Sequence, residues 1–309
     1  MNRVFLRSAV AVVLMSSALS VGCEKGGSTT PPDPTTAGVQ EAPRVAVPEA
    51  LGDDVGGRLF DRFYGESDLG FEPGKSGGPN GDGTLHDGGG NAMPSEGHDY
   101  RLKNLFGWDL RGVDGIYGPE YQAKKTVLPV NLLTDSRSVE ALVAWLTNGD
   151  DVVPAYGEVM SAEQILSIAE FVDGVRTGAL PGPTHVFELS KEAPKNYTLK
   201  SGADAERGKQ IYADACAGCH GEDARNIAVD GDNSVGLFAR TKAYEGWLKV
   251  LNGHPGSSMH REITFTSGDE GGQQILDLFA ALCDRTLFPS LDGVDDVPDG
   301  DLRCGSYLK

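Results

Sequence analysis

The sequence predicts a mainly α-helical protein with two tandem helical modules and long glycine-rich loops. Residues 145–172 and residues 247–282 share one plan, in which a Trp-Leu pair is followed by an Asn-Gly turn, a loop and a final helix. Several features that recur in the same order favour an internal duplication over chance similarity between two short helical segments. The length of 309 residues agrees, because it suffices for about two domains.

The final helix of each module carries an apolar stripe at helical spacing. The stripe residues are Ile165, Ile168 and Val172 in the first module and Ile275, Leu278, Phe279 and Leu282 in the second. Ser161 with Gln164, and Ser267 with Glu270, have the spacing of a capping box. We therefore expect both helices to begin at these serines.

The first helices of the two modules also correspond. Gly56 and Phe60 in the first module match Gly208 and Tyr212 in the second. A glycine and an aromatic residue four positions apart lie on one face of a helix. We predict that each glycine lets another helix cross closely and that the aromatic ring packs beside that crossing.

Residues 1–22 have the features of a signal peptide. Arg3 and Arg7 precede an apolar run that is too short for a stable membrane-spanning helix, and small residues follow it. With Cys23 directly after this run, the segment resembles a bacterial lipoprotein signal, in which the cysteine becomes the lipidated first residue. It departs from that pattern at Ser20, where leucine is preferred. An ordinary secretory signal with an incidental cysteine is the alternative, and both imply export.

The segment after the signal is expected to be a tether. Residues 23–49 are rich in proline, threonine, glycine and alanine and show no apolar period, which is typical of disordered chain. We expect the protein to be lipid-anchored at the bacterial outer membrane or to face the periplasm. The net charge of −18, with no basic stretch to offset it, argues against nucleic acid as a partner.

Cys216, Cys219 and His220 form a C-x-x-C-H motif, which is the attachment pattern for haem c. Two thiols three positions apart on a helical turn can reach the two vinyl groups of one haem edge, and the next residue supplies an imidazole to the iron. A thioredoxin-like site needs a βαβ setting, and a zinc site needs two more ligands at metal spacing. Neither context is found around this motif, so we expect one haem c.

The sixth iron ligand is predicted to lie downstream of the motif. Met259 is the only methionine in this half of the chain, and a soft thioether favours reduced iron. His254 and His260 are rival ligands that would give bis-histidine coordination. Alternatively, Met259 only fills space in a hydrophobic core, but the flanking glycine, serine and histidine argue against that role.

Residues 198–285 resemble a monohaem cytochrome c domain over their whole length. The resemblance rests on the C-x-x-C-H motif, on Gly208 with Tyr212 in the first helix, and on a loop around Met259 like the methionine loop of small cytochromes c. The segment departs from the family at His260, where proline is usual, and at Ala281, where an aromatic residue is frequent. The resemblance implies His220 and Met259 as axial ligands and electron transfer as the function.

Residues 50–177 resemble a cytochrome c domain that has lost its haem. Tyr64, Ser67 and Asp68 stand where the second module has its two cysteines and histidine, and Val153 stands where the methionine is expected. We expect Phe63, Tyr64 and Val153 to fill the vacated pocket. This module also carries a polar glycine-rich insert at residues 70–100.

The second module is expected to follow a structured linker and to be followed by an acidic C-terminal tail. Residues 178–197 form a linker, in which "HVFELS" and the following "NYTLKS" are candidate short strands, and Asp204 is a candidate N-cap. Cys283 and Cys304 are expected to form a disulfide, because an exported protein meets an oxidising compartment. Residues 286–309 are an acidic tail, whose aspartates fit a solvated loop better than a calcium site.

Electron transfer to a membrane-associated redox partner protein is the function that these features favour. A peroxidase-like haem enzyme is the first alternative, although it needs an open iron position and di-haem peroxidases need two attachment motifs. An accessory docking subunit of a membrane redox complex is the second. Trp108, Tyr117 and Tyr121 form either a docking surface or, as we favour, a packed connection.

Overall fold

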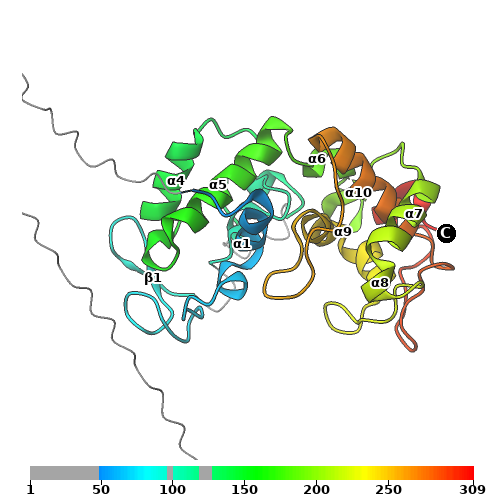
Figure 1. Cartoon of the computed structure of the whole chain (residues 1–309), viewed down its shortest axis with the longest axis horizontal. Helices are drawn as coiled ribbons and strands as arrows, with labels where there is room; N and C mark the ends of the chain where they lie inside the picture. The colour runs from blue at the N-terminus through cyan, green and yellow to red at the C-terminus, as the bar shows by residue number, and fades with distance from the viewer. Residues whose placement is uncertain (1–48, 96–99, 118–126) are drawn as a thin grey trace, which may run out of the picture. The chain divides into compact units, whose positions relative to one another are not determined.

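The computed structural model describes residues 49–95, 100–117 and 127–309 (Figure 1). The predicted signal peptide, Cys23 and nearly all of the predicted tether lie outside these residues. Residues 47–309 form one unit by their contacts. Within the described ranges, no helix combines the length and the apolar character that are needed to cross a bilayer.

The first half of the described chain consists of helices joined by long loops, with one short hairpin. Its elements are α1 (Asp53–Glu66), β1 (Leu85–His86), β2 (Ala92–Met93), α2 (Leu102–Phe106), η1 (Gly112–Asp114), α4 (Val139–Asn148), η2 (Tyr156–Glu158) and α5 (Ala162–Thr177). Strands β1 and β2 pair in antiparallel fashion. The mainly α-helical fold class is confirmed in this half.

The second half is also helical and contains a second two-stranded sheet. Its elements are α6 (Pro183–Val186), β3 (Phe187–Leu189), η3 (Pro194–Asn196), β4 (Tyr197–Leu199), α7 (Ala205–Ala215), α8 (Ala217–His220), α9 (Val235–Asn252), α10 (Gly268–Leu282) and η4 (Leu302–Tyr307). Strands β3 and β4 pair in antiparallel fashion with Phe187 opposite Leu199. The two strands predicted in the linker are therefore confirmed.

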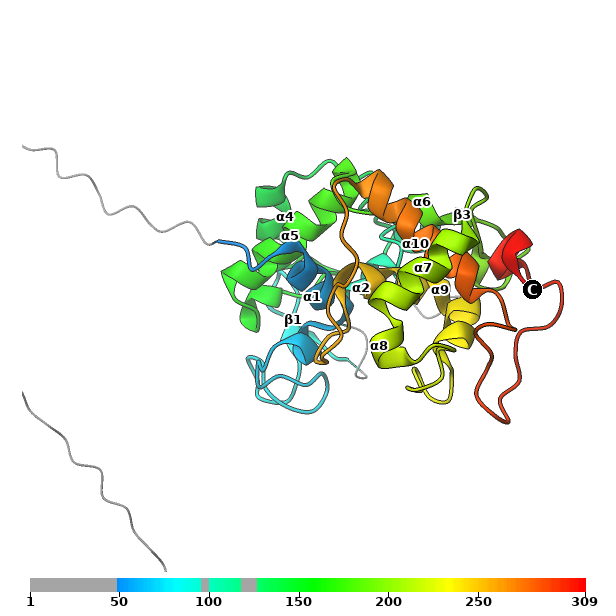
Figure 2. The same cartoon turned by 45° about the vertical axis from the view of Figure 1, so that its right-hand side comes forward.

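Both modules contain one close helix crossing, between α1 and α5 in the first and between α7 and α10 in the second (Figures 1 and 2). A Cβ atom on Gly56 would lie 2.0 Å from the carbonyl oxygen of Ser167, and one on Gly208 would lie 1.9 Å from that of Asp277. Such distances are far inside van der Waals contact, so only glycine permits either crossing. The prediction for both glycines is confirmed.

The helix caps agree with the sequence in part. Ser161 and Gln164 form a complete capping box on α5, and the side chain of Asp204 accepts hydrogen bonds at the start of α7. On α10 the Ser267 side chain accepts from the Glu270 N–H, but the Glu270 carboxylate accepts from the backbone and hydroxyl of Thr266 instead. The expected hydrogen bond from the Ser267 N–H to the Glu270 side chain was therefore wrong, because Thr266 offers two donors to the same carboxylate.

The aromatic connection in the first module is buried where the structure describes it. Trp108 and Tyr117 are nearly inaccessible, and the Trp108 carbonyl accepts a hydrogen bond of 3.2 Å from the Trp247 indole of α9. The Trp108 ring also meets the Tyr244 ring edge-on. For these two residues the packed connection is confirmed, while Tyr121 lies outside the described residues.

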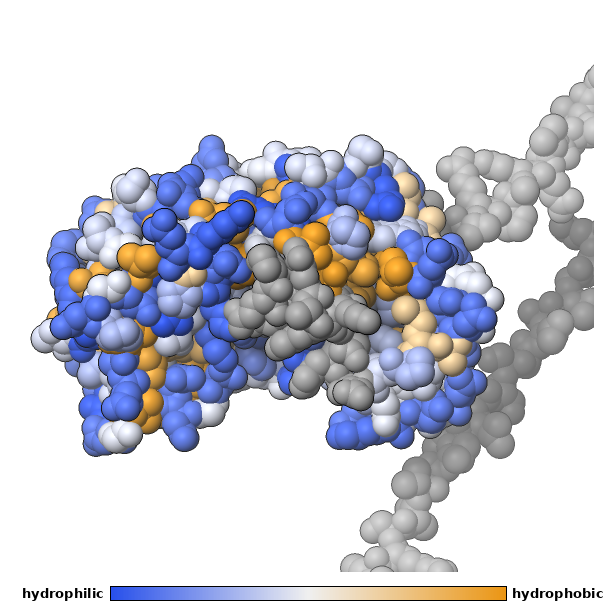
Figure 3. Space-filling model, turned by 180° about the vertical axis from the view of Figure 1, so that it is seen from behind, coloured by the Kyte–Doolittle hydropathy of each residue, from blue (hydrophilic) through white to orange (hydrophobic). Residues whose placement is uncertain are grey.

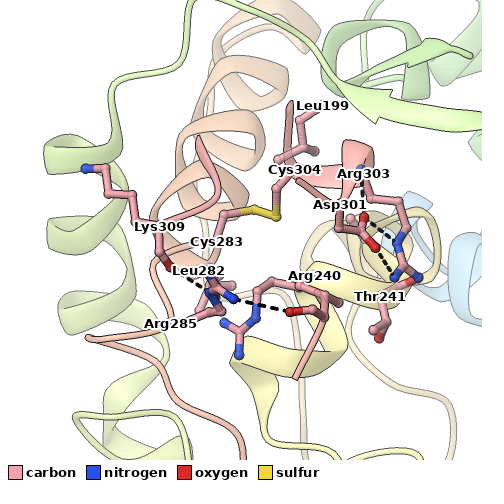
Figure 4. The surroundings of a disulfide bond; sticks show 12 residues. Leu199, Arg240, Thr241, Leu282, Cys283, Arg285, Asp301, Arg303, Cys304 and Lys309 are labelled. Carbon is pink, nitrogen blue, oxygen red and sulfur yellow. Dashed lines mark hydrogen bonds and ion pairs between the residues drawn. A yellow bond between two sulfur atoms is a disulfide. The ribbon is translucent and has the colours of Figure 1, made fainter. Parts of the chain in front are cut away.

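The C-terminal segment packs into the second module. Cys283 and Cys304 are joined by a disulfide, with their Cα atoms 6.0 Å apart (Figure 4). The Thr198 hydroxyl of β4 donates to the Leu302 carbonyl at 2.7 Å. The Phe288 ring, which is buried, lies 4.7 Å from the ring of Tyr212. Residues after α10 thus contribute to the core beside the first helix of the module.

Arginines neutralise part of the acidic tail. Arg240 is fully buried and forms an ion pair with Asp296, and Arg303 forms one with Asp301, whose side chain is nearly inaccessible (Figure 4). Burial alone would raise the pKa of Asp296, but hydrogen bonds from Arg240 and Ser290 lower it overall. The expectation of a wholly solvated loop was wrong for these two aspartates, because buried arginine requires a paired charge.

The surface is largely hydrophilic on the face shown in Figure 3, with apolar side chains gathered in part of it. Among the described residues, the large apolar side chains that are most exposed are Leu51, Val152, Leu189, Ile227, Leu287 and Leu302. Single exposed apolar side chains are ordinary on protein surfaces, so their exposure alone does not identify a docking face.

Candidate functional site

The C-x-x-C-H motif lies on a single helical turn. Cys216 ends α7 and begins α8, and the His220 N–H donates to the Cys216 carbonyl at 3.0 Å. Gly221 follows with φ +85°, which ends the turn. The Tyr212 hydroxyl donates to the Gly221 carbonyl at 2.7 Å and so ties the turn to α7. Both cysteines and the histidine are therefore held on one short, fixed segment.

The protonation states of this turn suit a haem attachment site. Cys216 and Cys219 are free thiols, and burial, with a smaller effect of Glu262 and Cys219, raises the pKa of Cys216 to about 11. Burial lowers the pKa of His220, so its imidazole is neutral at pH 7. The buried Nδ1 atom of His220 has no hydrogen-bond partner among the described residues. Two unbonded thiols and a neutral imidazole are the donor set that haem c requires.

Met259 lies in the loop between α9 and α10 and is partly buried. Its N–H donates to the Ser257 hydroxyl at 3.1 Å, and its carbonyl accepts from the His254 N–H at 2.9 Å. Gly253 has φ +88°, and a Cβ atom there would lie 2.3 Å from the Met259 carbonyl oxygen. The position of the Met259 backbone therefore depends on a glycine after α9.

The methionine loop and the cysteine turn lie within electrostatic range of each other. Glu262, three residues after Met259, is near enough to Cys216 to raise the pKa of that thiol. The contacts described for Met259 otherwise join it to its own loop. Of the rival ligands, His260 is exposed and His254 is partly buried, with its pKa lowered chiefly by burial.

The loop of the first module makes two of the same backbone contacts, although it is two residues shorter and has valine in place of methionine. Gly149 has φ +68°, and a Cβ atom there would lie 2.5 Å from the Val153 carbonyl oxygen. The Asp150 N–H donates to that carbonyl at 2.9 Å, as His254 does to Met259. Val153 is fully buried. Val153 and Met259 thus make matching backbone contacts after their Asn-Gly turns.

Aromatic rings pack together at the end of α1, where the second module has its cysteine turn. The Phe63 ring lies 5.2 Å from Tyr64, 5.8 Å from Phe71 and 5.5 Å from Tyr156. Phe71 also contacts Tyr100. We call these five residues the aromatic cluster. They include Phe63 and Tyr64, two of the three residues that were predicted to fill a vacated pocket.

Sequence reasoning missed the charged groups that join the two modules. Asp61 of α1 is buried and forms ion pairs with Lys103 of α2 and Lys249 of α9. The Lys103 ammonium also lies 3.7 Å from the centre of the Trp108 ring. Burial, only partly opposed by Asp61, lowers the pKa of Lys103 to about 8. No motif marks these residues, because isolated charges usually face solvent.

The family comparison covers the cysteine turn and the methionine loop. Residues 205–262 match the family model for cytochrome c. This segment is therefore similar to cytochrome c. The match begins with α7 and includes all four predicted haem-binding residues, so it supports covalently bound haem c in this part of the chain. Searches of curated proteins and of solved structures gave no significant match.

Proposed function

We propose that the protein is an exported electron carrier with one haem c in its C-terminal cytochrome c domain. The observation that carries this proposal is the turn 216–220, where two free thiols and a neutral imidazole lie within the segment that matches the family. Haem c, when bound, supplies a one-electron iron couple. The role of the chain is to attach it, to hold its axial ligands and to limit its contact with water.

The proposed ligand set is His220 with Met259. Cys216 and Cys219 would form the thioether links, and the neutral His220 ring would provide a nitrogen ligand to the iron. Glu262, which lies in the same loop as Met259, contributes to the raised pKa of Cys216, and this supports Met259 because it indicates that the loop lies near the cysteine turn. If His220 and Met259 both bound the iron, no position on it would remain open for a substrate, which favours electron transfer over catalysis.

The first module is proposed to be a degenerate cytochrome c domain. Three observations support this proposal: the Gly56 crossing repeats that of Gly208, Val153 repeats the backbone contacts of Met259, and the aromatic cluster follows α1. A fully buried valine and stacked rings leave no ligand for iron at these positions. This module then serves as a scaffold or as a docking element for a partner.

Export and lipid anchoring at Cys23 complete the proposal. The tether would keep the haem domain near a membrane-associated redox partner. A Cys23→Ala variant is expected to move from the membrane fraction to the aqueous fraction while it keeps its haem. Retention of this variant in the membrane fraction would refute the anchor without affecting the assignment of the haem site.

The haem assignment is tested by expression with a c-type haem maturation system. We expect a Cys216→Ser/Cys219→Ser variant to lose covalently bound haem. A Cys283→Ser/Cys304→Ser variant, which also removes two cysteines, should keep it. Denaturing gels stained for haem distinguish these outcomes, and equal staining of both variants would contradict the assignment.

The ligand assignment is tested by the absorption spectrum of the oxidised protein. Met259→Ala is expected to abolish the weak long-wavelength sulfur-to-iron band and to open the iron to added imidazole. An unchanged spectrum would overturn Met259 as the ligand. A high-spin spectrum of the unaltered protein, with turnover of peroxide, would favour the alternative of a peroxidase-like enzyme.

A further inference from the structure

Helix α1 of the first module contacts the segment of the second module that carries Met259. These contacts involve Asp53, Gly57, Arg58, Arg62, Gly65 and Glu66 on α1 and Asn252, Pro255, Gly256 and Arg261 on the segment. They include hydrogen bonds, one ion pair and two close approaches of glycine. Residues far apart in the chain are therefore joined directly at the methionine loop.

Arg58 connects α1 to the end of α9. Its guanidinium is buried and donates to Asp54 at 2.8 Å, to Glu66 at 2.7 Å and to the Asn252 carbonyl at 2.8 Å. Asn252 is the last residue of α9, so its carbonyl lacks a partner within the helix. A Cβ atom on Gly57 would lie 2.1 Å from the Asn252 side chain. This end of the loop therefore sits tightly against α1.

Arg62 and Glu66 reach further along the loop. Helix α1 is kinked at Arg62, which has φ −158° and ψ 82°, and its guanidinium donates to the Pro255 carbonyl at 2.9 Å. The Gly256 N–H donates to the Glu66 carboxylate at 3.3 Å. Gly256 has φ +68°, and a Cβ atom on it would lie 2.2 Å from the Gly65 carbonyl oxygen. The two backbones touch at this point.

The other end of the loop is also tied to α1. Arg261, two residues after Met259, forms an ion pair of 2.9 Å with Asp53 and donates to the Leu251 carbonyl. Between these ends, the described hydrogen bonds of residues 257–259 stay within the loop, and Ser257 and Ser258 are exposed. The first module thus holds the loop on both sides of Met259, while the loop orders its own tip.

We propose that α1 is a clamp that positions the methionine loop, with Arg58, Arg62, Glu66 and Asp53 as positioning residues for the sixth ligand. This inference rests on the proposed function, since it requires Met259 to bind iron. Hydrogen bonds from charged groups are the stronger class, so their loss should let the loop open more often. An open loop exposes the iron to added ligands. The haem-less module therefore acts on the haem of its neighbour.

The test uses the matured haem protein with an Arg62→Met substitution, which keeps the apolar stem and removes the donors. Arg176→Met is the matched control, because Arg176 also donates to two backbone carbonyls, at 2.8 Å each, but within the first module. We expect Arg62→Met to raise the affinity of the oxidised protein for imidazole about tenfold, as the loss of one charged hydrogen bond implies. The control should bind imidazole as the unaltered protein does.

Hydrogen exchange gives a second readout that does not depend on the haem spectrum. The amides of residues 254 and 256–259 should exchange about tenfold faster in Arg62→Met and at the original rate in Arg176→Met. Glu66→Gln, a milder change at the Gly256 contact, should also raise both the imidazole affinity and the rate of amide exchange. It replaces Arg62→Met in the test if that variant does not fold. Unchanged imidazole binding and exchange in these variants would overturn the clamp.

The two proposals fail in different ways. If Met259→Ala leaves the spectrum unchanged, the ligand assignment fails, and with it the premise of the clamp. If Met259→Ala opens the iron while the variants Arg62→Met and Glu66→Gln behave as the unaltered protein, the clamp alone is refuted.

Discussion

The two helical modules that the sequence predicts share a close helix crossing and a loop contact, but they differ in the residues that follow the first helix. In both, a glycine lets the first helix touch a backbone carbonyl of the last helix, and an Asn-Gly turn fixes the loop that follows the Trp-Leu helix. In the first module the end of α1 leads into buried aromatic rings. In the second the end of α7 leads into free thiols and a partly exposed methionine loop.

This difference shows which residues form the frame and which form the site. Glycines and caps set the backbone, so they recur in both modules. Side chains around the site vary with what they must pack against. The first module closes its core with Phe63 and Val153, both fully buried, whereas Cys219 and His260 of the second stay exposed. Substitutions at matched positions in the two modules test this division between frame and site.

The largest effect is expected at the aromatic cluster. Phe63→Ala should lower the free energy of unfolding by about 3–5 kcal/mol, because it leaves a cavity among four rings. Met259→Ala, in the equivalent region of the second module, should change the haem spectrum far more than the stability. Urea unfolding followed by circular dichroism measures both. A loss below 1 kcal/mol for Phe63→Ala would show that the cluster is not a packed core.

Removal of the carboxylate between the modules should be nearly as costly. Asp61→Asn leaves the Lys103 and Lys249 charges without their partner, and breaking a buried ion pair costs about 3 kcal/mol. Although burial raises the pKa of Asp61, the two lysines lower it overall from its ordinary value of 3.8. The folded state then binds fewer protons than the unfolded state, so stability is lost as pH falls.

The lowered pKa of Asp61 predicts how the effect of Asp61→Asn changes with pH. The difference in unfolding free energy between the unaltered protein and Asp61→Asn should be full at pH 7 and should shrink below about pH 4. Asp68→Asn, at an exposed position just after α1, is the control and should have little effect. A difference that grows toward low pH would contradict the ionised state of Asp61.

Substitution of the glycines at the two helix crossings tests whether these crossings are equivalent. Gly56→Ala and Gly208→Ala each place a methyl group about 2 Å from a carbonyl oxygen, so the helices must move apart. We expect each to lower stability by about 1–3 kcal/mol, as overpacking does. Similar losses in thermal unfolding would support equivalent crossings. A neutral Gly56→Ala would remove the main structural parallel between the modules.

The smallest effect concerns the helix caps. Ser161→Ala removes half of a reciprocal capping box and should cost about 1 kcal/mol. Ser267→Ala should cost less, because Glu270 bonds to Thr266 whether or not the serine is present. Chemical unfolding of the two variants compares them directly, and a larger loss for Ser267→Ala would reverse the interpretation of these caps.

The sequence predicted what local chemistry determines. Helix periods, the Asp204 cap, the paired strands and the cysteine turn all depend on residues that lie close together in the chain. The contacts of Arg58 and Arg62 with the methionine loop could not be predicted, because the acceptors there are backbone carbonyls more than 190 residues away that carry no signal. Buried Asp61 looked like an ordinary helix charge for the same reason.

The number of haem groups per chain is the decisive measurement for the proposed haem site. A pyridine haemochrome assay on the matured full-length protein, with peptide mapping of the attached group, gives both number and position. We predict one haem per chain, on the peptide that contains Cys216, Cys219 and His220. Two haems per chain, a colourless protein or a haem attached elsewhere would contradict the account.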